Sequence, residues 1–101
     1  MHRLFVDDTR EFPKWGYECC RDADTAIVLL SVMEFERISL DYNLGSDSKT
    51  GLDILIWIKE NNIFIPEINI HSDHIFGKDR MYEFCKENFP NSKVTLQTLP
   101  K

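Results

Sequence analysis

The sequence has no continuous apolar run near the roughly 20 residues that a helix needs to cross a bilayer. It also has no internal repeat and no low-complexity segment. The segment MHRLFVDDTR turns acidic after only a few apolar residues, which is not the pattern of a secretory signal peptide. These absences argue against a membrane-spanning or secreted protein, and we expect a cytoplasmic one with no membrane partner.

Cysteine is scarce, and its placement excludes two kinds of stabilisation. The three cysteines are odd in number and lack the spacing of a metal site or a disulfide framework. Cys19 and Cys20 are adjacent, so on a strand they would point to opposite faces and could not share a metal. We therefore expect reduced and partly buried thiols.

Positive charge is in deficit. The chain has 12 Lys and Arg against 17 Asp and Glu, a formal net charge of -5, which disfavours non-specific binding to DNA or to anionic membranes. A small local basic group could still hold a phosphate. With 43% hydrophobic and 29% charged residues over 101 positions, the chain suits one soluble globular domain spanning residues 1–101. The composition predicts no oligomeric state.

Short apolar runs alternate with segments of helical periodicity. Strands are predicted over residues 3–8, 17–21, 37–41, 67–72 and 93–99. The periodicity predicts helices over 22–34, 51–60 and 78–88. Asp22 is suited to cap the first helix, Thr50 and Gly51 open the second, and Asn61 and Asn62 are suited to end it.

This alternation is typical of βαβ units with a parallel sheet covered on both faces. We predict an α/β three-layer sandwich of the flavodoxin-like, receiver-like type, with five parallel strands in the order 2-1-3-4-5. The link over residues 9–16 contains Pro13 and Gly16 and is too short for a full helix. The helix between the first two strands should be reduced or missing, leaving one face thinly covered.

Polar side chains end three of the predicted strands. The first strand ends in Asp7 and Asp8, the third in Asp41, and the fourth in His71 and Ser72. In this strand order, ligands bind beyond the carboxyl ends of the strands where the order reverses, between the first and third strands. These five side chains are therefore predicted to surround one crevice.

Converging carboxylates repel one another unless a pKa rises or a cation binds. Carboxylate oxygens suit a hard cation such as Mg²⁺, which proteins often hold together with a substrate phosphate. Arg10 follows the first acid pair and offers a planar fork of donors for such a phosphate. A single Asp at a strand end is usually a turn residue, but polar groups at three adjacent strand ends indicate a functional site.

Four segments carry a resemblance to a known family. VDDTR, SLDYNLG, TGLDILIWI and HSDHIFGKDRM, in this order, resemble the motifs of the cyclic-phosphate processing receiver domains, small relatives of the response-regulator receivers. The resemblance covers nearly the whole chain. It implies a receiver-like fold and a role in processing cyclic phosphate ends of nucleotides or RNA. The matching positions are Asp7, Asp8, Arg10, Asp41, His71, Ser72 and Gly77.

The chain departs from the family pattern at two places. Tyr42 and Asn43 stand where the pattern has His and Asp, and His74 and Ile75 stand where it has Asn and Pro. The first change removes an acid and a histidine from the predicted crevice, and the second adds a histidine nearby.

The first hypothesis is a phosphoesterase that opens a cyclic phosphate. Such a reaction needs a positioned water, stabilised phosphoryl oxygens and a proton for the departing sugar oxygen. We assign the catalytic roles to Asp8, Asp41 and His71. The metal ligands would be Asp7, Asp8 and Asp41, with Mg²⁺ as the expected cofactor. The substrate would be bound by Arg10, Ser72 and His74.

Some roles stay open at this point. His71 and His74 are both candidates for proton transfer, because an unperturbed histidine titrates near neutral pH. His71 could instead be the last core residue of its strand. Trp15 and Phe12 are candidates to stack on a base, although aromatic residues in small domains are usually core.

Two further hypotheses remain. In a phospho-accepting receiver, Asp7 and Asp8 would bind Mg²⁺ and Asp41 would accept the phosphoryl group. A receiver also needs a lysine at the end of the fifth strand, and here Lys101 comes only after Pro100. The last hypothesis is a non-catalytic module that binds a nucleotide or a protein in the same crevice.

Overall fold

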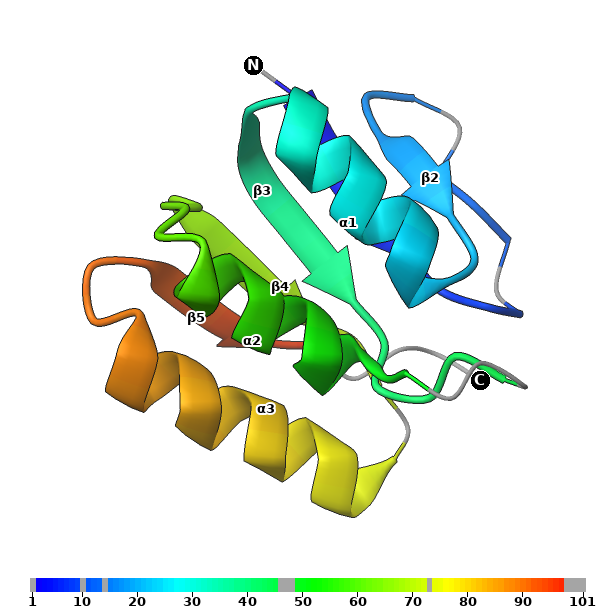
Figure 1. Cartoon of the computed structure of the whole chain (residues 1–101). Coiled ribbons are helices and arrows are strands. Elements are labelled where there is room, and N and C mark those ends of the chain that lie inside the picture. Colours follow the sequence, from blue (N-terminus) through cyan, green and yellow to red (C-terminus); the bar gives the residue numbers. More distant parts are fainter. Residues whose placement is uncertain (1, 10, 14, 46–48, 73, 98–101) are drawn as a thin grey trace.

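A computed structural model describes residues 2–9, 11–13, 15–45, 49–72 and 74–97. Five parallel strands form one sheet in the order β2-β1-β3-β4-β5, which confirms the predicted flavodoxin-like arrangement (Figure 1). The strands are β1 His2–Val6, β2 Glu18–Cys20, β3 Phe35–Leu40, β4 Glu67–Ile70 and β5 Lys93–Leu96. The helices are α1 Ala23–Val32, α2 Gly51–Glu60 and α3 Ile75–Asn88. As predicted, β1 leads to β2 without a helix in the described part of the link.

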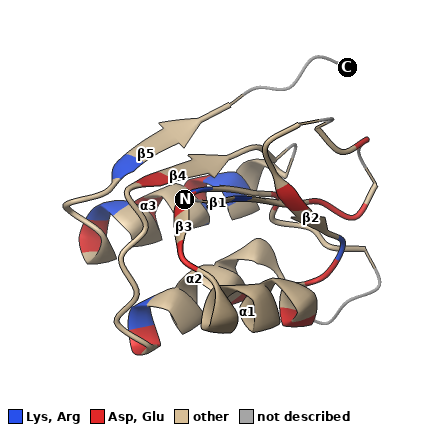
Figure 2. Cartoon of the chain, turned by 90° about the horizontal axis from the view of Figure 1, so that it is seen from above, with Lys and Arg blue, Asp and Glu red and all other residues tan. Residues whose placement is uncertain are grey.

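The three helices lie on one side of the sheet (Figure 2). The connections from β2 to β3, from β3 to β4 and from β4 to β5 all cross the sheet in the same direction. Because parallel crossovers are right-handed, these three helices must cover the same face. The link from β1 to β2 runs the other way and passes over the opposite face. Among the described residues no helix covers that face, so the second helical layer of the expected three-layer sandwich is not formed there.

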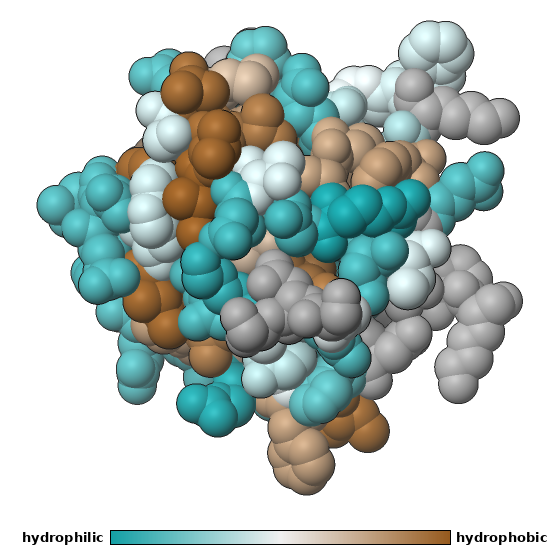
Figure 3. Space-filling view, turned by 45° about the vertical axis from the view of Figure 1, so that its right-hand side comes forward, coloured by the Kyte–Doolittle hydropathy of each residue, from teal (hydrophilic) through white to brown (hydrophobic). Residues whose placement is uncertain are grey.

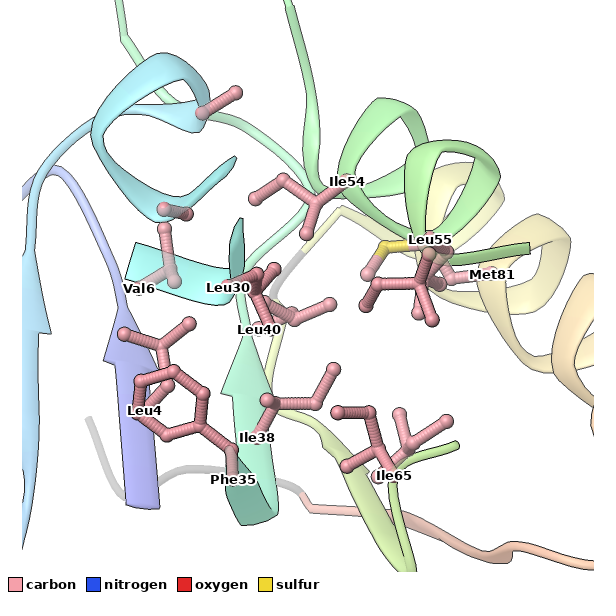
Figure 4. Close-up of a cluster of buried hydrophobic side chains, with 14 of the residues drawn as sticks. Leu4, Val6, Leu30, Phe35, Ile38, Leu40, Ile54, Leu55, Ile65 and Met81 are labelled. Carbon is pink, nitrogen blue, oxygen red and sulfur yellow. The ribbon is translucent and has the colours of Figure 1, made fainter. Parts of the chain in front are cut away.

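The hydrophobic core lies between the sheet and the helices (Figure 4). Inward-facing residues of neighbouring strands are direct cross-strand partners, as Leu4 is of Ile38 and Ile38 is of Ile68. Leu30, Ile54 and Met81 are among the residues that the helices place against them. Each fully buried aliphatic side chain of this kind stabilises the fold by about 1.5–3 kcal/mol before entropy is counted. The three cysteines are free thiols, as expected.

Two helix starts are fixed by side chains. At α2, the carboxylate of Asp53 accepts hydrogen bonds from the backbone N–H and the hydroxyl of Thr50, as expected of a capping residue. The predicted start of α3 at residue 78 was wrong. The helix begins at Ile75, because Nδ1 of His74 accepts the N–H of Gly77 at 2.9 Å and caps the first turn. The predicted last strand ends earlier, at Leu96, and residues 98 and 99 lie outside the described residues.

The face without helices is polar and is partly covered by the link from β1 to β2. The ring of Phe5 contacts the rings of Phe12 and Tyr17 edge-on, at centroid distances of 6.2 and 6.1 Å. The hydroxyl of Tyr17 accepts a hydrogen bond from Nε of Arg37 at 2.9 Å. The link therefore packs on the sheet through aromatic side chains in place of a helix.

Apolar side chains reach the molecular surface in separate groups among hydrophilic ones (Figure 3). Trp15 in the link is 85% exposed, and Ile75 and Phe76 are exposed in the first turn of α3. Among the described residues, no helix is both long enough and apolar enough to span a membrane.

Candidate functional site

The strand ends meet at one edge of the sheet. The sheet hydrogen bonding continues one residue past the strands, since the N–H of Asp41 donates to the carbonyl of Val6 at 3.1 Å. The N–H of His71 donates in the same way to the carbonyl of Leu40 at 2.9 Å. Asp7, Asp41 and His71 therefore stand side by side in one row, as the strand order predicted.

Three carboxylates form an acidic cluster at this edge. Asp7, Asp8 and Asp41 each offer an oxygen atom, and these oxygens lie within 4.8 Å of one another. Asp7 is fully buried, Asp41 is 8% exposed and Asp8 is half-buried. Burial raises the pKa of Asp41, and the negative charges of Asp7 and Asp8 raise it further. Hydrogen bonds from the Ser72 hydroxyl and from the backbone of Tyr42 oppose this rise in pKa.

The oxygens of Asp7 are fixed by the protein on both sides. Oδ1 accepts the N–H of Thr9 at 3.0 Å, and Oδ2 lies 3.1 Å from Nε2 of His71. A carboxylate held in this way is oriented before any ligand arrives. Three close carboxylates are a donor set that suits a hard divalent cation, so the acidic cluster could hold a metal ion.

Two glycines let the loop after β3 approach the acids closely. Gly45 has a φ of +69°, and a Cβ built on it would lie 2.7 Å from Oδ2 of Asp8. A Cβ on Gly51 would lie 2.1 Å from the backbone oxygen of Asp41. A side chain at either position would push into the acidic cluster or its backbone, which is why the SLDYNLG turn and the TG helix start need glycine there.

His71 lies beneath the acidic cluster and not on its surface. Its ring is fully buried and stacks on the ring of Phe5 at a centroid distance of 4.6 Å. Nδ1 lies 2.6 Å from Oγ of Ser39, and Nε2 lies 3.1 Å from Asp7. With both nitrogens facing protein atoms, His71 in this conformation cannot donate a proton to a substrate directly. The structure thus shows His71 as a buried partner of Asp7, and its predicted catalytic role stays a prediction.

Ser72 and His74 lie on the other side of the cluster. Besides its hydrogen bond to Asp41, the hydroxyl oxygen of Ser72 accepts the N–H of His74 at 3.1 Å. Ser72 is buried, whereas His74 is exposed. His74 is therefore both the cap of α3 and a side chain available at the rim of the site.

The two departures from the family pattern contact each other. The rings of Tyr42 and His74 have their centroids 4.8 Å apart with an angle of 31° between the planes. Tyr42 also covers Gly77 so closely that a Cβ there would lie 2.2 Å from its ring. Asn43 points elsewhere, and its Oδ1 accepts the N–H of Gly45 at 3.1 Å. Of the changed residues, Tyr42 and His74 thus pack together next to Asp41 and Ser72.

Arg21 was missed by the sequence reasoning. Its guanidinium donates to the backbone carbonyl of Asp7 at 3.2 Å and lies 3.9 Å over the ring of Phe12. It follows β2, the strand next to β1, so considering the end of the second strand would have found it. The predicted phosphate-binding residue Arg10 and the residue Lys101 lie outside the described residues.

A mainly apolar hollow of about 790 Å³ lies away from the acidic cluster, where α1 and α2 end. Met33, Phe35, Trp57 and Phe64 contribute to its lining. It lacks the converging carboxylates found at the opposite edge of the sheet. The acidic cluster is therefore the candidate functional site among the described residues.

Comparison with known families agrees with this geometry. The model of the cyclic-phosphate processing receiver domain matches residues 2–87, which include both acid motifs and Ser72. The chain belongs to this family. This cyclic-phosphate processing receiver domain has no significant match among curated protein sequences.

A solved structure supports the fold. This receiver domain is similar to a response regulator protein from Burkholderia pseudomallei, whose crystal structure contains a phosphorylated aspartic acid, a calcium ion and citrate. The TM-score is 0.65 at 16% sequence identity, and the match covers 99% of this chain. It covers 61% of the response regulator, so this chain corresponds to only part of that protein.

Proposed function

We propose that this domain opens a cyclic phosphate on a nucleotide or on an RNA end, with Mg²⁺ held by the acidic cluster. The observation that carries the proposal is the convergence of Asp7, Asp8 and Asp41 within 4.8 Å at the strand ends. Membership of a cyclic-phosphate processing family supports the substrate class. The raised pKa of Asp41 supports the cation, because a positive charge would relieve both causes of that rise, burial and the neighbouring acids.

Hydrolysis of a cyclic phosphate adds water across one phosphorus–oxygen bond. The water oxygen forms a new bond to phosphorus, the bond to one sugar oxygen breaks, and that oxygen takes a proton. A bound Mg²⁺ would supply positive charge for the phosphoryl oxygens. Asp8 is the acid of the cluster that is only half-buried, so it is placed to accept a hydrogen bond from the attacking water.

The rim offers donors for the phosphate. Because Nδ1 of His74 accepts the N–H of Gly77, a neutral His74 carries its proton on Nε2. In this neutral form, the Nε2–H is suited to donate to a phosphoryl oxygen. By family resemblance, Arg10 is a further donor in the proposed substrate site. The predicted substrate contact of Ser72 is not included, because its one hydroxyl proton is already donated to Asp41.

The sequence indicated Phe12 and Trp15 as candidates to stack on a base. Phe12 is occupied, because it packs on Phe5 and lies under the guanidinium of Arg21. Trp15 is exposed, but it precedes the amino end of β2, which runs parallel to β1, so it lies toward the edge of the sheet opposite to the acidic cluster. Neither residue is therefore assigned to the base of the proposed substrate.

The proposal is tested by incubating the protein with 2′,3′-cyclic and 3′,5′-cyclic nucleotides and with RNA carrying a cyclic phosphate end. Reactions run with Mg²⁺ or with EDTA, and products are separated by chromatography. We expect ring opening that needs Mg²⁺ and falls at least 100-fold in Asp41→Asn. Asp24→Asn is the matched control, because Asp24 is an exposed acid that pairs with Lys49 away from the cluster. If none of these substrates is opened, the proposal of a hydrolase is rejected.

A phospho-accepting receiver is the second candidate, and one observation favours it. Asp41 follows β3 beside two acids in a fold similar to that of a response regulator with a phosphorylated aspartic acid. Against it, β5 ends at Leu96 and is followed by Gln97, so the described end of this strand carries no lysine. Incubation with acetyl phosphate and Mg²⁺, followed by intact mass, separates the two. We expect no added phosphoryl group on Asp41.

A third outcome is also distinguishable. If a nucleotide binds without being opened, and Asp41→Asn abolishes that binding, the domain is a non-catalytic nucleotide-binding module. Calorimetry with the same cyclic nucleotides in Mg²⁺ gives this measurement.

A further inference from the structure

A row of polar residues crosses the face of the sheet that carries no helix. Ser39 on β3 is the direct cross-strand partner of Asn69 on β4, and Asn69 is the partner of Thr95 on β5. Ser39 and Asn69 are 3% and 2% exposed. Buried polar groups in the middle of a sheet are costly unless their hydrogen bonds are satisfied, so this row needs an explanation.

The row is connected by hydrogen bonds that end at the acidic cluster. Oγ1 of Thr95 donates to Oδ1 of Asn69 at 2.7 Å. Nδ2 of Asn69 donates to Oε1 of Gln97 at 2.8 Å and to Oγ of Ser39 at 3.0 Å. Oγ of Ser39 lies 2.6 Å from Nδ1 of His71, and Nε2 of His71 lies 3.1 Å from Oδ2 of Asp7. The polar chain, meaning Asn69, Ser39 and His71, therefore leads from β4, the neighbour of the edge strand β5, to Asp7.

The direction of the hydrogen bonds in the polar chain follows from Asp7, the group at which the chain ends. An ionised Asp7 only accepts hydrogen bonds, so Nε2 of His71 must carry a proton. In a neutral imidazole Nδ1 is then an acceptor, and the hydroxyl of Ser39 must donate to it. The Ser39 oxygen in turn accepts from Asn69. Each donor in the polar chain thus points toward Asp7, and one arrangement satisfies every member.

We propose that Ser39 and Asn69 are positioning residues that act on the acidic cluster through His71. They hold His71 in the Nε2–H tautomer and in one ring orientation, and His71 holds the Asp7 carboxylate. Removing a group that hydrogen-bonds directly to a metal ligand typically changes metal affinity 10- to 100-fold. Ser39 and Asn69 lie one and two hydrogen bonds behind His71, so their removal should have an effect near the lower end of this range. The cation part of this inference rests on the proposed function, whereas the hydrogen-bond direction does not.

Two substitutions separate positioning from packing. Ser39→Ala removes the donor to Nδ1 of His71. Asn69→Asp keeps the shape but replaces the donor to Ser39 by an acceptor, which turns the Ser39 hydroxyl away from His71. Ser39→Thr keeps the hydroxyl and should restore function. Ser92→Ala is the matched control, because Oγ of Ser92 donates to the carbonyl of Ile65 at 2.6 Å, outside the polar chain.

The first measurement is the tautomer of His71, read from long-range ¹⁵N–¹H correlation spectra at neutral pH without added metal. His71→Gln assigns the signals. We expect the Nε2–H tautomer in the wild-type protein and in Ser92→Ala. In Asn69→Asp, the correlation pattern of His71 should change toward that of a protonated Nδ1. In Ser39→Ala, only the ¹⁵N chemical shift of Nδ1 should change. A wild-type protein with the Nδ1–H tautomer overturns the proposal.

The second measurement is the affinity for Mn²⁺ and for Mg²⁺ by calorimetry, on variants whose circular dichroism confirms folding. We expect a loss of about 10-fold in Ser39→Ala and Asn69→Asp, the lower end of the range for a direct partner, and a change of less than about threefold in Ser39→Thr and Ser92→Ala. Equal affinities in Ser39→Ala and Ser92→Ala overturn the positioning role. A wild-type protein that shows the expected tautomer but binds neither ion rejects the cation site instead, and leaves the hydrogen-bond direction established.

Discussion

Asp41 occupies a position that is unfavourable for an ionised carboxylate in the absence of a cation. It is nearly buried and shares the strand ends with Asp7 and Asp8. A group whose folded-state pKa is raised binds protons more tightly in the folded state than in the unfolded state. The contribution of Asp41 to stability must therefore decrease as the pH rises above its ordinary pKa of 3.8 and through the raised value.

The first prediction concerns Asp41→Asn in metal-free buffer. The variant should be more stable than the wild type at pH 7 by at least about 1 kcal/mol, because one of the repelling charges is removed. The difference should shrink as the pH is lowered, since Asp41 then becomes protonated in the wild type. Urea denaturation at several pH values measures it. A variant that is less stable at pH 7 would show that the hydrogen bonds of the Asp41 carboxylate outweigh its repulsion from the other two acids.

The second prediction concerns the contact of Tyr42 with Gly77. Gly77→Ala should cost about 1–3 kcal/mol, because the added Cβ would lie 2.2 Å from the tyrosine ring. In a Tyr42→Ala background the same substitution should cost less than about 0.5 kcal/mol, or become favourable, since helices prefer alanine to glycine. Urea denaturation of the four proteins gives the coupling energy. Equal costs in both backgrounds would rule out the ring as the cause.

At the scale of the elements, α3 begins with an uncommon cap. His74 provides the acceptor that Asn, Asp or Ser more often supply, and this explains why the sequence pattern placed the helix start three residues too late. The exposed Ile75 and Phe76 also obscured the helical periodicity there, because they face away from the core. A start fixed by one side-chain hydrogen bond cannot be found from hydrophobic spacing.

The third prediction tests this cap. His74→Ala should destabilise the protein by about 0.5–2 kcal/mol, whereas His74→Asn should keep most of the stability, because asparagine is a strong cap. Thermal unfolding followed by circular dichroism measures both. If alanine and asparagine give the same melting temperature, the hydrogen bond to Gly77 does not stabilise the helix start.

The strands and the acidic cluster were predictable for a physical reason. Alternation in β3 and β4 identifies buried strands, and the parallel order then brings Asp7, Asp41 and His71 to one edge. The sequence left open whether His71 is buried, because period-two spacing gives the face of the sheet on which a residue lies but not what covers that face. The polar chain was missed for the same reason, since Ser39 and Asn69 appear as ordinary outward-facing residues.

At the scale of the whole molecule, the helices stabilise one face of the sheet and the link from β1 to β2 protects the other. Phe12 is central to this protection, since it packs on Phe5 and supports Arg21. Phe5 in turn stacks on His71. The link therefore contacts, through Phe12 and Phe5, the buried His71 that lies next to Asp7 of the acidic cluster.

The fourth prediction is that Phe12→Ala costs about 2 kcal/mol, a reduced value for a half-buried aromatic residue. It should also speed hydrogen exchange of the backbone amides of Asp7 and His71, because their cover is loosened. Phe64→Ala is the control, since Phe64 is exposed at the other end of the sheet and should change stability by less than about 0.5 kcal/mol. Similar effects of both substitutions would show that the link is not a cover.

The one-sided helix layer has a consequence for how the chain finds its strand pairing. Along β3, Ile38 and Leu40 face the helices while Arg37 and Ser39 face the other way. A slip of β3 by a single residue would reverse every one of these side chains, placing an arginine among the aliphatic residues and two aliphatic residues in the polar row. Such mispaired states would lose the apolar packing on the helix side and the hydrogen bonds of the polar row on the other side. The alternation of polar and apolar residues along β3 therefore specifies the strand register as well as the two faces of the sheet.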